Sequence, residues 1–315
     1  MLLTDRPAPA AAITAFFIAL IGIEAFDRLL ALLGERGLAF GRTPAYMVSI
    51  GMQCVFFAVP ALLYCRANPR TLPAMRIRRM DPLCAGMLAL AALVGMLAFN
   101  WVSFLWVRAL DWMGLVTDTG QAETPQTLWQ LGWMLAAAAL APAFFEEALF
   151  RGFLLPSMEP FGRRRAMWIS GVMFALLHGR IEALPTHLIL GAMLAWLTLE
   201  TDCLPYAILY HAAYNAAILV AAYGTARARP EALGMATSLG ESLRSLPAVI
   251  ILLGVWTALL IAAMRRGRRK RRDWLPPATR VPMPMTARGM LVASFVLLGL
   301  VQARALMRML PGAGP

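Results

Sequence analysis

Two adjacent carboxylates and an arginine lie inside an apolar run of the sequence that begins near Leu128: Glu146, Glu147 and Arg151. A charge in the hydrocarbon region of a membrane costs about 2.5–3.5 kcal/mol on insertion scales, so each of these groups needs a partner or a task. Glu147 and Arg151 are four residues apart, which places them on one helix face in the favourable acid-first order. Glu146 has no such partner. A carboxylate of this kind can serve as a general base that takes a proton from water.

Two histidines and an asparagine in later apolar segments fall at a similar depth. Counting ~1.5 Å per residue from the cytoplasmic surface, Glu146 lies about 15 Å deep and His178 about 20 Å, while His211 and Asn215 lie at about 10 and 16 Å. The spacing of four puts His211 and Asn215 on one face, as it does Phe174 and His178. A base, a polar donor and an imidazole are the groups that amide hydrolysis requires. Either histidine alone would be read as a packing residue, but together with Glu146 they indicate chemistry.

The same three side chains also raise the question of a metal. Glu146, His178 and His211 offer one oxygen and two nitrogens, the ligand types of a catalytic zinc. The sequence contains no His-Glu-x-x-His helix, and the estimated depths spread over about 10 Å. We therefore favour a metal-free site without any cofactor and keep zinc as the alternative. His187 follows an outer turn near Leu184, so we expect it to lie outside the site.

The amino-acid composition predicts that transmembrane helices position these residues. Of 315 residues, 60% are hydrophobic and only 15% are charged, which is typical of a polytopic membrane protein and not of a soluble domain. We predict an all-α bundle of eight to nine transmembrane helices. The apolar runs lie near residues 12–33, 45–65, 84–106, 128–157, 164–180, 184–200, 203–223, 247–264 and 287–307.

The fourth run is longer than a bilayer needs and contains Pro142, one turn before Glu146. A proline within a helix interrupts the hydrogen-bond ladder, so we predict a kinked or tilted helix here. The carbonyl that the proline leaves without a donor needs a neighbouring group or water.

The formal net charge of +12 is concentrated in loops between alternate spans, at residues 66–79, 163–165 and 265–272. The positive-inside rule explains this pattern, so we predict a cytoplasmic N-terminus and no nucleic-acid partner. The last basic run is read as a topology determinant, with binding of anionic lipid as the alternative. Arginine greatly outnumbers lysine, which suggests a GC-rich bacterial genome and therefore the bacterial cytoplasmic membrane.

We divide the chain into N-terminal helices at residues 1–127, a catalytic core at 128–223 and C-terminal helices at 224–315. The first three spans show no ionisable group of residues that could carry a reaction, so we interpret them as a peripheral layer. Glu24, Asp27 and Arg28 are interpreted as a local helix-end group, with a place on a substrate path as the alternative.

Three spacings together resemble the motifs of the CPBP family, which comprises the CAAX prenyl endopeptidases and bacterial relatives once linked to bacteriocin immunity. The motifs are intact, in order, and fall between residues 128 and 222: Glu146-Glu147 with Arg151, Phe174 with His178, and His211 with Asn215. Each spacing alone would be weak, whereas the combination is specific.

The resemblance implies an intramembrane endopeptidase acting on a membrane-anchored protein or peptide, near its C-terminus, within the lipid bilayer. The residue matching Glu146 would activate water, and those matching His178 and His211 would assist. Asn215 would support the oxyanion, and the remaining charged pair would hold the site together. Relatives in bacteria also process C-terminal sorting tails, which is an alternative substrate class. A proton-relaying transporter, or a non-catalytic immunity or scaffold protein, remains a competing interpretation.

Overall fold

The computed structural model describes residues 5–37, 41–115, 124–228, 239–270 and 281–310. The described residues form helices and no strands, which confirms the predicted all-α polytopic bundle. Eight of their helical segments are long and apolar enough to cross a membrane. The elements, in which η marks a 3-10 or π-helical segment, are α1 (Pro9–Glu35), α2 (Arg42–Gln53), η2 (Cys54–Ala58), α3 (Val59–Ala67), η3 (Pro69–Met75), α4 (Pro82–Trp112), α5 (Leu128–Met134), η4 (Leu135–Leu140), α6 (Ala141–Glu147), η5 (Ala148–Leu154), α7 (Leu155–Met158), η6 (Glu159–Phe161), α8 (Arg163–Leu177), η7 (Ile181–Ala183), α9 (Leu184–Thr201), α10 (Leu204–Ala228), α11 (Leu239–Arg269) and α12 (Met285–Arg308).

Eight of the nine predicted spans correspond to helical segments long enough to cross a membrane, and the predicted span at 164–180 does not. It corresponds to α8, which has 15 residues and begins with three arginines. At ~1.5 Å per residue such a helix extends about 22 Å, which is less than the ~30 Å hydrocarbon core. It packs along α9 as the first arm of a helical hairpin. Arg271 and Arg272, which belong to the predicted basic run, lie outside the described residues.

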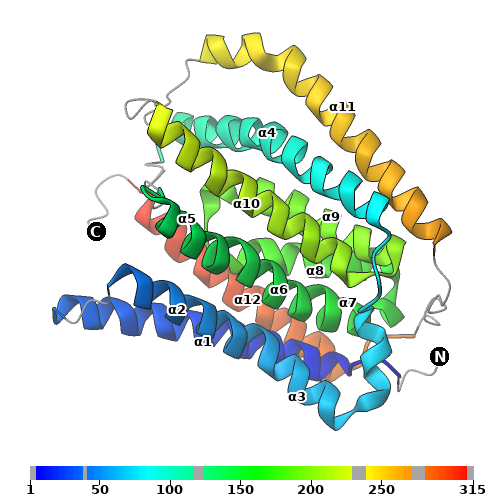
Figure 1. Ribbon diagram of the computed structural model, residues 1–315. Coiled ribbons are helices and arrows are strands. Elements are labelled where there is room, and N and C mark those ends of the chain that lie inside the picture. The colour runs from blue at the N-terminus through cyan, green and yellow to red at the C-terminus, as the bar shows by residue number, and fades with distance from the viewer. Residues whose placement is uncertain (1–4, 38–40, 116–123, 229–238, 271–280, 311–315) are drawn as a thin grey trace.

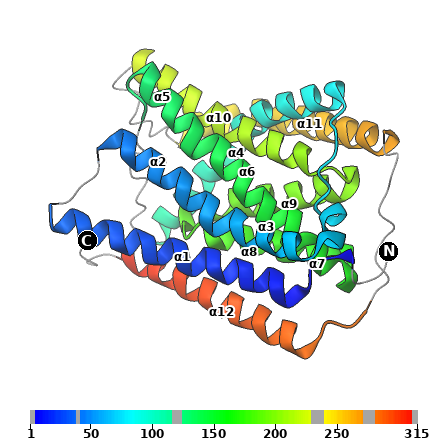
Figure 2. The ribbon, with the colours of Figure 1, turned by 60° about the horizontal axis from the view of Figure 1, so that its bottom comes forward.

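Helices α5 to α10 lie in the middle of the bundle. Figure 1 shows α4 and α11 along one side and α1 to α3 along the other, with α5 to α10 between them. Figure 2 shows α12 beside α1 on the outer surface, and the two helices contact each other. The N-terminal helices therefore do not form one layer, because α1 to α3 and α4 cover opposite faces of the core.

The long run Leu128–Phe161 is one helical segment interrupted by two π-helical stretches, η4 and η5. Pro142 cannot donate a backbone hydrogen bond, so the carbonyls one turn earlier lose their ordinary partner. Side-chain amides replace it: Asn215 Nδ2 donates to Ala138 O at 3.2 Å, and Gln53 Nε2 donates to Ala137 O at 3.0 Å. The predicted need for a neighbouring donor at this proline is thereby confirmed, and both donors come from other helices.

Close packing of α8 on α9 depends on glycine. A Cβ atom on Gly191 would lie 2.7 Å from Gly171 O and 3.0 Å from the ring of Phe174. Small residues of this kind let helices in membranes approach closely. The contact brings the Gly191 carbonyl near Arg151 and places the two ends of the hairpin side by side.

A buried charge network fixes the far end of the Glu146 helix. Arg76 donates to Glu159 and to Asp202, both at 2.7 Å, and Arg6 also contacts Glu159. All four side chains are buried. Because a buried ion pair is costly to break, this network ties the N-terminal segment and the start of α10 to the end of the Glu146 helix.

Candidate active site

Glu147 is the centre of a buried polar cluster. Its Oε1 accepts hydrogen bonds from Arg151 Nη1 at 2.7 Å and His211 Nδ1 at 3.0 Å. Arg151 Nη2 donates to Gly191 O at 2.8 Å, and neither Glu147 nor Arg151 is exposed to any measurable extent. The spacing of four thus predicted the Glu147–Arg151 pair correctly.

His211 lies against Glu147, whereas the depth estimate had paired it with Glu146. The estimate counts only the rise along each helix and ignores direction around the axis. Successive residues on a helix point about 100° apart, so two adjacent glutamates face different neighbours. Helix α10 packs on the side of Glu147, and Glu146 faces away from His211 toward α1 and α2.

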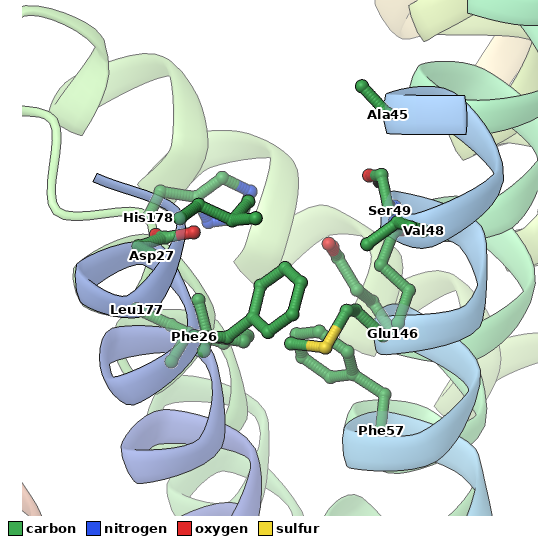
Figure 3. A pocket seen from close by; sticks show the side chains of 13 residues that line it. Phe26, Asp27, Ala45, Val48, Ser49, Phe57, Glu146, Leu177 and His178 are labelled. Atoms are coloured by element: carbon green, nitrogen blue, oxygen red, sulfur yellow. Dashed lines mark hydrogen bonds between the residues drawn. The ribbon is translucent and has the colours of Figure 1, made fainter. Parts of the chain in front are cut away.

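Glu146 is 9% exposed, and its Oε2 has no hydrogen-bond partner among the described residues. It lines a cavity of about 310 Å³ together with His178 (Figure 3). A buried polar atom without a partner costs about 1–3 kcal/mol, so such an atom at a cavity wall indicates a place for a ligand or water. A carboxylate that acts as a general base on a molecule in the cavity is expected to have this arrangement.

The opposite wall of the cavity comes from the N-terminal helices. Asp27 on α1 and Ser49 and Gln53 on α2 supply polar groups among apolar neighbours. From the sequence, Glu24, Asp27 and Arg28 were interpreted as a helix-end group, with a substrate path as the alternative, and the first three spans were interpreted as peripheral. The structure corrects this, because α1 and α2 line the same cavity as Glu146.

His178 ends α8 and its ring is held in a defined direction. Its Nδ1 lies 2.8 Å from the carbonyl oxygen of Phe174, which can only accept, so Nδ1 carries the proton. In the neutral ring Nε2 is then an acceptor that can take up a proton. His178 can therefore exchange a proton with a group in the cavity.

His187 stacks on His178, with ring centroids 4.0 Å apart and planes at 25°. The sequence analysis placed His187 outside the site because it follows the outer turn. Both histidines lie within about one turn of that same turn, His178 before it and His187 after it, so the hairpin brings the rings together. This symmetry about the turn was the signal that the depth estimate overlooked.

Phe174 connects the two parts of the site. It is fully buried, its ring lies 4.7 Å from the ring of His178 and 5.8 Å from that of His211, and the Arg151 guanidinium is 4.5 Å from its centroid. A cation over an aromatic face is attracted to it, and the ring also fills the space between α8 and α10. Phe174 thereby fixes the positions of three polar side chains.

The amide of Asn215 is engaged with the carbonyl of Ala138 in the π-helical stretch η4. We expect Asn215→Ala to lower the free energy of unfolding by about 1–3 kcal/mol, because the carbonyl that Pro142 leaves unpaired loses its donor. In a Pro142→Ala background the new backbone N–H can serve that carbonyl, so the same Asn215→Ala change should cost clearly less. Unfolding of the four proteins in mixed micelles measures this coupling. Equal costs in both backgrounds would show that the contact with Ala138 does not stabilise the helix.

The residues do not fit a zinc site. Among the described residues, no group of three or more His, Cys, Asp and Glu side chains is arranged to hold a metal. The three candidate ligands do not share one cavity, since Glu146 and His178 line it and His211 does not. No step of the chemistry below involves a metal.

Comparison with known families agrees with these motifs. The family described as "Type II CAAX prenyl endopeptidase Rce1-like" matches residues 128–217, which include all three motif pairs. The resemblance to the CAAX protease family is thereby confirmed for this segment. No curated protein and no solved structure matches the chain. Helices α1 to α4, α11 and α12 lie outside the matched segment, as do the cavity residues Asp27 and Gln53.

Proposed function

We propose that this integral membrane protein is an intramembrane endopeptidase that hydrolyses a peptide bond of a membrane-associated protein or peptide. One observation carries the proposal: within the segment that resembles CAAX endopeptidases, Glu146 is buried and unpaired at the wall of a cavity that it shares with His178. We further propose a cytoplasmic N-terminus and a location in a bacterial cytoplasmic membrane.

In the proposed reaction Glu146 takes a proton from a water molecule in the cavity, and the hydroxide attacks the carbonyl carbon of the scissile bond. An N–H of the Asn215 amide that is not donated to Ala138 stabilises the oxyanion. As the carbon–nitrogen bond breaks, the leaving amine receives the proton from Glu146, directly or through Nε2 of His178. The products are a new carboxyl group and a new amine, and Glu146 returns to its ionised form.

His211 has a different task in this scheme from the one that the family resemblance implies. Because its Nδ1–H donates to Glu147 Oε1, His211 positions Glu147, Arg151 and α10 and takes no part in the activation of water. Glu147 and Arg151 hold the Glu146 helix against α9 through the Gly191 carbonyl. These residues are positioning residues, and Glu146 and His178 are the proposed catalytic pair.

We propose cleavage near the C-terminus of the substrate, either next to a lipid anchor or at a C-terminal sorting tail. Cells that produce the wild-type protein, the Glu146→Gln variant or neither can be compared by mass spectrometry of the C-termini of their membrane and surface proteins. A set of C-termini that is shortened only with the wild-type protein supports the proposal. Identical C-termini in all three, or shortening that persists with Glu146→Gln, would leave a transporter or a non-catalytic immunity protein as the better interpretation.

A further inference from the structure

The cavity that Glu146 lines has an exposed end and a buried end. Asp27 on α1 and Ala45 on α2 are exposed, whereas Phe57 and Glu146 are buried. Figure 3 shows Asp27 beside His178 on one side, with Ala45 above and Glu146 and Phe57 lower on the other side. A substrate segment that enters from the exposed end therefore passes Asp27 before it reaches Glu146.

Asp27 has no cation to balance it in this cavity. It makes no ion pair or hydrogen bond with any described residue, and none of the described residues that line the cavity is a lysine or an arginine. Two basic residues on α1 and α12 belong to a separate groove: Arg304 pairs with Glu24 at 3.2 Å, and Arg28 lines the groove with them.

The other groups of the cavity supply no permanent positive charge. His178 is held with its proton on Nδ1 by the Phe174 carbonyl, so its ring is neutral unless it gains a second proton. Glu146 is itself an acid. Gln53 contributes a buried Oε1 without a partner, and Ser49 contributes a neutral hydroxyl, so neither side chain brings a positive charge to the wall. A carboxylate held at an apolar cavity without a counter-charge is stabilised by an incoming cation.

We propose that Asp27 binds a cationic side chain of the substrate, a lysine or arginine close to the scissile bond, and so selects basic peptide segments and orients them toward Glu146. This proposal rests on the proposed peptidase function and adds a substrate class to it. It also gives α1, which lies outside the family-matched segment, a task in recognition. Asp27 acts on binding and orientation and takes no part in the proton transfers.

The test uses the full-length protein in lipid nanodiscs with membrane-anchored peptides. Each peptide carries Lys, Gln or Glu at one position, and a series of peptides moves this position along the part of the sequence that contains the scissile bond. For the wild-type protein we expect kcat/KM to be higher for Lys than for Gln at one position by about two- to fivefold, the effect of a single partly exposed ion pair. Asp27→Asn should remove this preference, and Asp27→Lys should reverse it in favour of Glu. Glu24→Gln is the matched control, because Glu24 lies one turn away on the same helix and does not line the cavity. This control should keep the preference for Lys.

The outcomes separate this proposal from the one on which it depends. Cleavage by the wild-type protein that is equal for Lys, Gln and Glu at every position would overturn the role of Asp27 and leave the peptidase intact. A preference for Lys that survives Asp27→Asn would do the same. Absence of cleavage of every peptide, with wild-type and Glu146→Gln proteins indistinguishable, would overturn the peptidase function and this proposal with it.

Discussion

Glu147→Gln is expected to lower the free energy of unfolding by about 3–5 kcal/mol, the usual cost of removing one partner of a buried ion pair. Arg151 is fully buried and would keep its charge with only neutral acceptors, the Gly191 carbonyl and the new amide oxygen at position 147. His211 would also lose its carboxylate partner. Reversible unfolding in mixed micelles, or thermal melting in detergent, measures the loss.

Two comparisons make this prediction specific. Glu146→Gln is the same chemical change one residue earlier, at a carboxylate whose Oε2 has no partner, so its melting should stay close to that of the wild type. A Glu147→Gln, Arg151→Met double variant removes both charges and should recover part of the loss, because no uncompensated ion remains. A Glu147→Gln protein as stable as the wild type would contradict the assignment of the buried pair as the structural centre of the site.

Glu146→Gln should lower kcat/KM for peptide cleavage by a factor of about 10²–10⁴, which is the contribution of a positioned general base. Glutamine keeps the size and shape of the side chain but cannot take a proton from water. The change should therefore appear in turnover and leave the fold unaltered. Kinetics and melting measured on the same preparation distinguish this from loss of folded protein. If Glu146→Gln were the less stable of the two variants and still turned over substrate, the roles of the two glutamates would have to be exchanged.

The sequence allowed the membrane-spanning class, the Glu147–Arg151 pair and the gap left by Pro142 to be predicted, because each follows from local spacing or from the cost of placing polar groups in lipid. The partner of His211 could not be predicted in this way. It depends on the direction in which α10 approaches the Glu146 helix, and rise along a helix contains no information about that direction. The stacking of His187 on His178 could not be predicted for a related reason, since depth alone does not show which rings meet across a turn.

The contributions of α1 and α2 were missed because neutral or isolated polar residues in an apolar run carry no spacing signal. Gln53 is ordinary in sequence, and its importance comes from the π-helical stretch η4 on another helix, whose Ala137 carbonyl needs a donor. Asp27 was interpreted as part of a helix-end group with Glu24 and Arg28, and a place on a substrate path was the alternative. The packing of α12 supplies Arg304 to Glu24, and Asp27 does not share this partner.

The central claim is that Glu146 activates water for peptide hydrolysis, and cleavage by the purified, chelator-treated protein tests it most directly. Wild-type protein in nanodiscs is incubated with membrane-anchored peptides, and the products are identified by mass spectrometry alongside Glu146→Gln. We expect one defined cut with the wild-type protein, carrying one oxygen from labelled water in the new carboxyl group, and no cut with the variant. Equal cleavage by both proteins, or cleavage that appears only when zinc is added back, would contradict the claim.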